Sequence, residues 1–213
     1  MSFPVVTVWR EALNSKRFRI HLFLSAFFLL LCAFTAPILF QFIQKRQGFI
    51  LNDYLLDWLP AFDLSLWTFI LLYFLIFLGV FSLLTYPHQF LITLQAYVLL
   101  TVLRFVTILL IPLEPPGNII ELIDPFVQHL FYQQSVTKDL FFSGHTSLLV
   151  LLTLAVPSPK IRIVLFMGTF LIASMLLIQH AHYTVDVVLA PLFSWMVFVM
   201  VKKFSIKKAQ GLH

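Results

Sequence analysis

Two short polar motifs interrupt an otherwise apolar chain. Residues 143–146 read Ser-Gly-His-Thr, and residues 180–186 read His-Ala-His-Tyr-Thr-Val-Asp. Ionisable side chains at the ends of apolar helices are costly to keep there, and they usually serve chemistry. Imidazoles and a carboxylate are groups that acid–base and nucleophilic catalysis use. We therefore expect these motifs to form one catalytic site.

His182 and Asp186 are the first predicted pair. They are four positions apart, and on a helix this spacing places both side chains on one face. A carboxylate that accepts the proton of one imidazole nitrogen fixes the tautomer and leaves the other nitrogen free to attack. His180 points to a different face at this spacing, and its role stays open.

His145 and Arg104 complete the predicted chemistry. His145 follows Gly144 at the expected start of a helix, where a small residue lets a substrate approach and the positive helix end favours an anion. From there His145 can donate a proton to a leaving oxygen, while Arg104 neutralises charge on the transferred group. This set suits phosphoryl or phosphodiester transfer through a phosphohistidine, with no cofactor.

Zinc is the main chemical rival, because imidazole and carboxylate side chains are also metal ligands. The side chains that offer such ligands are His145, His180, His182 and Asp186. The chain has no His-Glu-x-x-His pattern, so we expect no metal.

The composition places these residues in a membrane protein. Of the 213 residues, 61% are hydrophobic and 11% are charged, whereas soluble domains carry about 25% charged residues. Mean hydropathy is +0.97. The net charge of +5 does not indicate nucleic-acid binding, because the basic residues gather at the ends of apolar runs instead of forming a stripe with aromatic residues.

The apolar runs predict an all-α, polytopic fold with about six transmembrane helices, since a spanning helix needs about 20 apolar residues. These runs cover 20–43, 65–86, 89–112, 141–157, 161–180 and 183–203. Residues 1–19 resemble an amphipathic cytoplasmic segment, residues 20–203 form the membrane catalytic domain, and residues 204–213 form a basic cytoplasmic tail. The loops at 48–64 and 117–134 fit either interfacial helices or the walls of a lipid-entry groove.

Basic residues set the predicted orientation, because cytoplasmic loops are rich in Lys and Arg. The basic residues that share one side of a six-helix topology are Arg10, Lys16, Arg17, Arg19, Lys160, Arg162, Lys202, Lys203, Lys207 and Lys208. Both termini are therefore expected in the cytoplasm, with the site on the exoplasmic side, periplasmic or lumenal. Arg104 lies about 24 Å along its helix from His88 and below the outer surface, so it needs an anionic partner or a polar cavity.

The motifs also resemble a known family. Residues 143–146, with Asp139 four positions before Ser143, and the run from His182 to Val187 are similar to the paired motifs of sphingomyelin synthases, in the type 2 phosphatidic acid phosphatase superfamily. The stretch from Arg104 to Gly117 is similar to the segment before the first motif. The resemblance covers residues 65–205 and implies six helices and an exoplasmic active site.

This resemblance implies a membrane lipid phosphotransferase. His182 would take the headgroup phosphate from a phospholipid donor, Asp186 would be its partner, and His145 would act as acid and then as base. A lipid alcohol, ceramide in the known synthases, would accept the phospho-headgroup. The residues expected to bind substrate are Arg104, Asp139, Ser143, Gly144 and Tyr183.

One departure separates the chain from the phosphatase branch. That branch carries a Lys-x6-Arg-Pro motif and a Ser-Arg pair before its last histidine, whereas this chain lacks the first and has Met175 and Leu176 at the second. The difference favours the synthase-like branch. A lipid phosphate phosphatase or phospholipase C-like hydrolase is the enzyme alternative, and a non-enzymatic lipid-binding or transport protein is the alternative from another class. The headgroup, the acceptor, the oligomeric state and the roles of Glu114 and Glu121 stay open.

Overall fold

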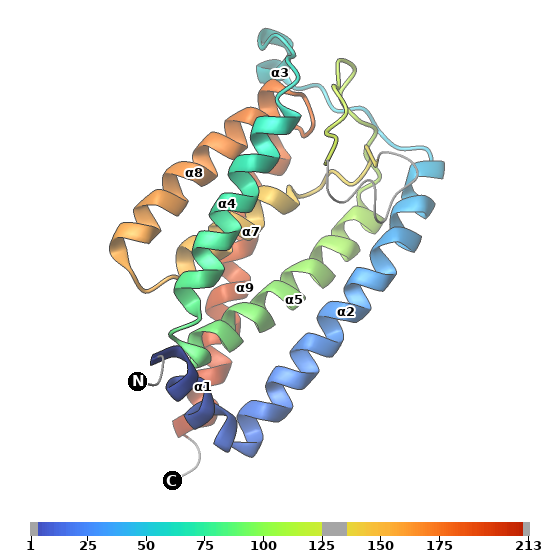
Figure 1. The fold of residues 1–213 in the computed structure, drawn as a ribbon. Coiled ribbons are helices and arrows are strands. Elements are labelled where there is room, and N and C mark those ends of the chain that lie inside the picture. Colours follow the sequence, from blue (N-terminus) through green and yellow to red (C-terminus); the bar gives the residue numbers. More distant parts are fainter. Residues whose placement is uncertain (1–3, 125–135, 211–213) are drawn as a thin grey trace.

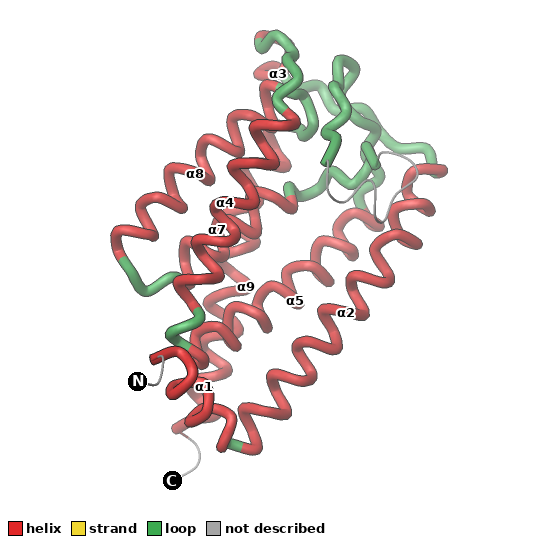
Figure 2. The backbone as a smooth tube through the Cα atoms, in the orientation of Figure 1, coloured by secondary structure: helices red, strands yellow, loops and turns green. Residues whose placement is uncertain are grey.

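Helices make up the body of the protein, and the longer loops gather at one end (Figure 2). The computed structural model describes residues 4–124 and 136–210. Its helices are α1 (Pro4–Asn14), α2 (Lys16–Lys45), α3 (Tyr54–Trp58), α4 (Ser65–Leu83), α5 (Pro87–Leu110), α7 (Gly144–Ala155), α8 (Pro159–Ile178) and α9 (Thr184–Gln210). The all-α prediction is confirmed. α9 extends into the segment that the sequence assigns to a tail.

Within the described residues, five helices are long and apolar enough to cross a membrane, namely α2, α4, α5, α8 and the part of α9 over Thr184–Ser205. The protein is therefore an integral, multi-pass membrane protein. The remaining predicted span, 141–157, contains the shorter helix α7 of 12 residues. At about 18 Å this helix is shorter than the hydrocarbon layer of about 30 Å. Its first turn lies within the height of the bundle (Figure 1).

The two ends of the chain lie at the same end of the bundle. Figure 1 shows α1 beside the last turns of α9, while α3 and the connections around it occupy the opposite end. The expected interfacial helix in 48–64 is the five-residue helix α3. In the other loop, residues 117–124 are not helical, and residues 125–135 lie outside the described part of the chain.

The core forms where α4, α7, α8 and α9 pack together. Its most buried side chains include Leu75 of α4, Leu149 of α7 and Ile172 of α8, each no more than 1% exposed. A Cβ atom on Gly168 would lie 2.4 Å from the Leu75 side chain. Only glycine allows α8 to approach α4 this closely, which is a common device in membrane helix packing.

Helix α2 is the least embedded of the spanning helices. Within its most apolar window 11% of residues are buried, against 22–33% for the other spans. It packs mainly against α5 and is attached at both ends. At one end Phe18 of α2 packs edge-on against Trp9 of α1, and the Trp9 indole donates to the Leu84 carbonyl at 2.7 Å. At the other, the Arg46 guanidinium donates to the carbonyls of Ile108 and Leu109 at the end of α5.

Candidate active site

The first motif forms the start of α7. Ser143 is the N-cap, and its hydroxyl accepts a hydrogen bond from the Thr146 N–H at 3.5 Å, which satisfies a free amide at the helix start. The Ser143 N–H donates to the Asp186 carbonyl oxygen at 3.1 Å. The two polar motifs are therefore in direct contact.

The turn between α8 and α9 positions the second motif. α8 ends in a Schellman motif, in which the His180 N–H donates to the Leu177 carbonyl and the Ala181 N–H donates to the Leu176 carbonyl, both at 3.0 Å. His180 takes the left-handed position of this motif, with φ of 55°, where glycine is most common. The sequence therefore carries no glycine signal for this helix end.

His182 precedes α9 instead of belonging to it. Because α9 begins at Thr184, the expectation that His182 and Asp186 share a helix face is wrong, although the two side chains do meet. The Asp186 Oδ2 atom accepts a hydrogen bond from the Tyr183 N–H at 3.0 Å, as the third residue of a helix does in half of a capping box. The same oxygen lies 3.5 Å from the His182 Nδ1 atom.

The contact between His182 and Asp186 is buried and long. Their side chains are 5% and 0% exposed, and 3.5 Å exceeds the usual hydrogen-bond length. Catalytic hydrogen bonds commonly tighten only when substrate binds. Since Nδ1 is the ring nitrogen near the carboxylate, Nε2 is the nitrogen that remains for a substrate.

Arg104 of α5 is held by the segment just before α7. Its Nη2 atom donates to the Asp139 carboxylate at 2.9 Å and to the Asp139 carbonyl at 2.6 Å, and its Nε atom donates to the Phe142 carbonyl at 2.8 Å. Asp139 is therefore the anionic partner that a guanidinium at this depth requires. A Cβ atom on Gly144 would lie 3.0 Å from the Arg104 Cζ atom, so Arg104 also passes close to the start of α7.

A groove of about 330 Å³ reaches these residues from between α2, α5 and α7. Its lining includes Arg104, Asp139, Gly144 and His145. The remaining lining is mainly apolar and includes Leu29, Cys32, Ala33, Ala36 and Phe40 of α2. His182 and Asp186 are not among the lining residues. The structure thus brings Arg104, Asp139 and His145 to a groove and places the His182 pair outside its lining.

Unsatisfied polar atoms concentrate at the two motifs. Among the described residues, four buried side-chain nitrogen or oxygen atoms lack a hydrogen-bond partner, and three of them are His145 Nδ1, His182 Nδ1 and Asp186 Oδ1. Buried polar atoms are normally paired, and exceptions often mark catalytic groups. The fourth is the hydroxyl of Thr68, next to Phe69, whose ring packs edge-on against His145 at 5.8 Å.

Two polar residues of the second motif point away from the groove. The His180 Nε2 atom lies 3.0 Å from the Leu59 carbonyl oxygen, which makes His180 an anchor for the loop after α3. The Tyr183 hydroxyl donates to the Glu114 carbonyl at 3.0 Å and accepts from the Leu51 N–H at 3.2 Å. Tyr183, expected to bind substrate, therefore contacts the loops instead. In the described part of the chain, no group of three or more His, Cys, Asp or Glu side chains is arranged to hold a metal ion.

Asp53 supports the site and has no recognisable motif. Its carboxylate accepts from the Thr184 N–H at 2.6 Å and from the Thr184 hydroxyl at 2.8 Å, and it also caps α3. Burial raises the pKa of Asp53, but the hydrogen bonds from Thr184, Leu56 and Leu55 outweigh burial and lower this pKa below its ordinary value. Asp53 is therefore ionised, and its carboxylate holds the first turn of α9 in place.

Glu114 joins the loops that follow α2 and α5. It accepts from the Lys138 ammonium at 2.8 Å and from the Gly48 N–H at 2.8 Å. The hydrogen bond from Lys138 is the main reason that the pKa of Glu114 is lowered. Glu114 is thus placed in a supporting network beside the segment that carries Asp139.

Comparison with known proteins gives one finding. A search of curated proteins finds no match to the chain. A family model described as PAP2 superfamily C-terminal matches residues 138–204, less than half of the chain, and this segment contains Asp139, the first motif, His182 and Asp186.

Proposed function

We propose that this protein is a membrane lipid phosphotransferase that moves a phospho-headgroup, such as phosphocholine, from a glycerophospholipid to a lipid alcohol such as ceramide. The family match to residues 138–204 indicates a lipid phosphatase or phosphotransferase. The observation that carries the proposal is the contact between the two motifs. The Ser143 N–H bonds the Asp186 carbonyl at 3.1 Å, and His182 lies 3.5 Å from the Asp186 carboxylate.

In the first proposed half-reaction, the Nε2 atom of neutral His182 attacks the donor phosphorus. The bond between phosphorus and the glycerol oxygen breaks, and His145 gives a proton to that oxygen, so that diacylglycerol leaves as an alcohol. Asp186 accepts the Nδ1–H hydrogen bond and stabilises the charge on the imidazole. Arg104, fixed by Asp139, neutralises charge on the phosphoryl oxygens.

In the second half-reaction, the hydroxyl of the lipid alcohol attacks the phosphohistidine. His145 takes the proton of that hydroxyl, and the bond between phosphorus and His182 breaks. Because both substrates are lipids, they need lateral access from the bilayer. The groove between α2, α5 and α7 supports this step, since it joins an apolar lining to Arg104 and His145. We place this site on the exoplasmic side, as the basic residues predict.

The deciding experiment is an acceptor-dependence assay with the purified full chain. Headgroup-labelled phosphatidylcholine is supplied with and without ceramide or diacylglycerol. Label is expected to move into a new lipid only when an acceptor is present, and His182→Ala is expected to abolish this transfer. Release of water-soluble headgroup that does not depend on an acceptor would assign the same site to a hydrolase. The absence of any headgroup chemistry would leave a lipid-binding or transport protein.

Asp186→Asn tests the role of the carboxylate. We expect kcat to fall by roughly 10²- to 10⁴-fold, because an amide no longer fixes the reactive tautomer of His182. Asp57→Asn makes the same chemical change at an exposed carboxylate of α3 and should leave kcat unchanged. Full activity of the Asp186→Asn variant would remove the proposed mechanism.

A further inference from the structure

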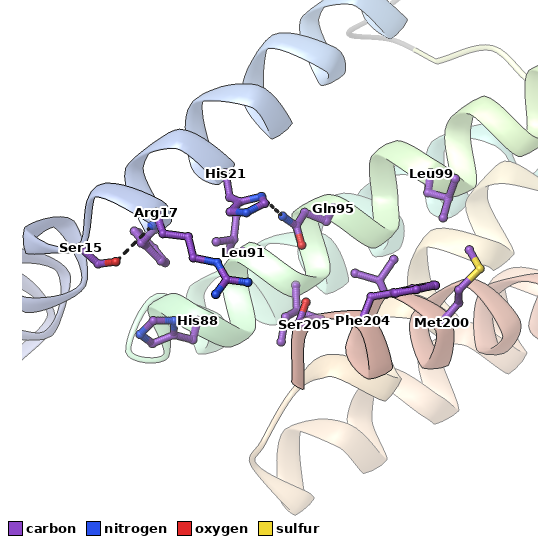
Figure 3. A pocket seen from close by; sticks show the side chains of 13 residues that line it. Ser15, Arg17, His21, His88, Leu91, Gln95, Leu99, Met200, Phe204 and Ser205 are labelled. Carbon is purple, nitrogen blue, oxygen red and sulfur yellow. Dashed lines mark hydrogen bonds between the residues drawn. The ribbon is translucent and has the colours of Figure 1, made fainter. Parts of the chain in front are cut away.

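A second and larger cavity lies at the opposite end of the bundle from the candidate active site. Its volume is about 850 Å³, and it lies between the first turns of α2, the first half of α5 and the last turns of α9 (Figure 3). His88, on its lining, precedes Arg104 on α5 by about 24 Å. A headgroup bound there is therefore out of reach of His145 and His182, and the proposed reaction makes no use of this cavity.

The end of this cavity nearest the first turn of α2 is polar and basic. Figure 3 shows the Arg17 side chain reaching from α2 toward α5, above His88. Deeper in, the Gln95 Nε2 atom lies 3.5 Å from the His21 Nδ1 atom. Among the described residues that line the cavity, none is Asp or Glu. Further basic residues stand on the same helix ends, namely Lys16, Arg19, Lys202 and Lys203.

The rest of the cavity is apolar. Leu91 and Leu99 of α5 face Met200 and Phe204 of α9 across it. Phe204 is 67% exposed, so this wall continues to the lipid-facing surface. A basic, hydrogen-bonding end joined to an apolar body matches a molecule with an anionic head and hydrocarbon chains.

We propose that this cavity binds one anionic phospholipid of the same membrane. Its phosphate lies at Arg17 and His88, and an acyl chain fills the space between α2, α5 and α9. The lysines and arginines around the cavity, together with a described lining that holds no carboxylate side chain, select a net negative headgroup over a zwitterionic one. The lipid supports α2, whose most apolar window is only 11% buried, against the bundle.

Native mass spectrometry of the purified, delipidated full chain tests this site. Phosphatidylglycerol is expected to bind with 1:1 stoichiometry and more tightly than phosphatidylcholine of the same chains. Arg17→Gln should weaken phosphatidylglycerol binding by about fivefold, the effect of removing one basic residue near an anionic lipid. Arg19→Gln is the matched control, because it removes the same charge from the same turn of α2 at an exposed residue outside the cavity. It should have less than half of this effect.

Two further measurements distinguish a site for a whole lipid from a site that binds phosphate alone. Ile92 of α5 also lines the cavity, so Ile92→Trp fills the apolar space and should lower phosphatidylglycerol binding without removing charge. Glycerol 1-phosphate, which carries the phosphate without acyl chains, should not displace the lipid. Equal weakening by Arg17→Gln and Arg19→Gln, equal affinity for phosphatidylcholine, or displacement by glycerol 1-phosphate would each overturn the proposal. If Ile92→Trp fails to fold, the Arg17 and Arg19 comparison still decides.

Discussion

Arg104 is held so closely that Gly144 has no room for a side chain. Three hydrogen bonds fix the guanidinium to Asp139 and Phe142, so displacing it to admit a new methyl group, which would lie 3.0 Å from its Cζ atom, would distort these bonds. Small displacements of a group that positions substrate cost large factors in rate. At this position the absence of a side chain is therefore a geometric requirement of the site.

Gly144→Ala should lower kcat/KM for headgroup transfer by about tenfold, because Arg104 is displaced by a few tenths of an ångström. Gly117→Ala is the control, since a Cβ atom there meets nothing within 4 Å. Steady-state kinetics of both variants, with thermal unfolding as a check on folding, measure the effect. Unchanged kcat/KM in Gly144→Ala would show that Arg104 is not required at its observed position.

Single residues were predictable where a motif marks them. His145, His182 and Asp186 stand out because imidazoles and a carboxylate are rare in an apolar chain. Asp53 does not stand out, because its contact with Thr184 joins residues 131 positions apart, and nothing local to either residue signals it. Tyr183 shows the reverse problem: its place inside a motif suggested substrate binding, whereas its hydroxyl contacts the loop at Glu114.

At the scale of helices and turns, spans were easier to predict than their ends. The predicted run 161–180 compares with α8 at Pro159–Ile178, and the run 183–203 begins one residue before α9. Long apolar runs determine such spans. The turn between them was not predictable, because His180 occupies a left-handed position that sequence rules assign to glycine or asparagine.

The left-handed turn at His180 can be tested by substitution. Asparagine tolerates this backbone, whereas a β-branched residue pays a penalty of about 1–2 kcal/mol. His180→Val should therefore unfold roughly 2–8 °C below His180→Asn in detergent. Both variants remove the imidazole that lies at the Leu59 carbonyl, so the loss of the imidazole does not account for a difference between them. Equal melting temperatures would mean that this residue does not adopt the left-handed conformation.

The carboxylate at the start of α9 should give a pH-dependent stability. Hydrogen bonds lower the folded-state pKa of Asp53, so its contribution is fully present above the unfolded pKa of about 3.9. That contribution is lost as the pH falls through this value and then through the folded pKa. The melting temperature of Asp53→Asn should be lower than wild type at pH 7 and should fall less steeply between pH 5 and 3. Asp57→Asn should keep the wild-type slope, and a wild-type slope in Asp53→Asn would contradict this assignment.

At the scale of the whole molecule, the chain is a helical bundle. The longer loops lie at one end of it, and α1 and the last turns of α9 lie at the other end. Hydropathy predicts the crossings because each depends on its own run of residues. The groove at Arg104 and the cavity at Arg17 depend on how far α2 stands from the bundle. That distance is set by contacts at both helix ends, such as Arg46 with the carbonyls of α5, which no single run encodes.

The orientation of the bundle can be measured by labelling. In a Cys32→Ala background, a cysteine is placed at Trp58, which is 88% exposed in α3, or at Lys203 near the end of α9. In sealed vesicles with the exoplasmic face outward, an impermeant maleimide should label Trp58→Cys at once and Lys203→Cys only after permeabilisation. The opposite pattern would place the candidate active site in the cytoplasm.

The hydrogen bonds from Thr184 to Asp53 also decide how much of the chain must be kept together for the site to form. The segment that the family model matches, residues 138–204, is held in place by residues outside it. Asp53 holds the start of α9, and Arg104 of α5 bridges Asp139 and Phe142. A fragment or chimera cut at the borders of that segment would keep both motifs and lose the groups that hold them in register. A functional fragment or chimera must therefore contain more of the chain than the segment that similarity identifies.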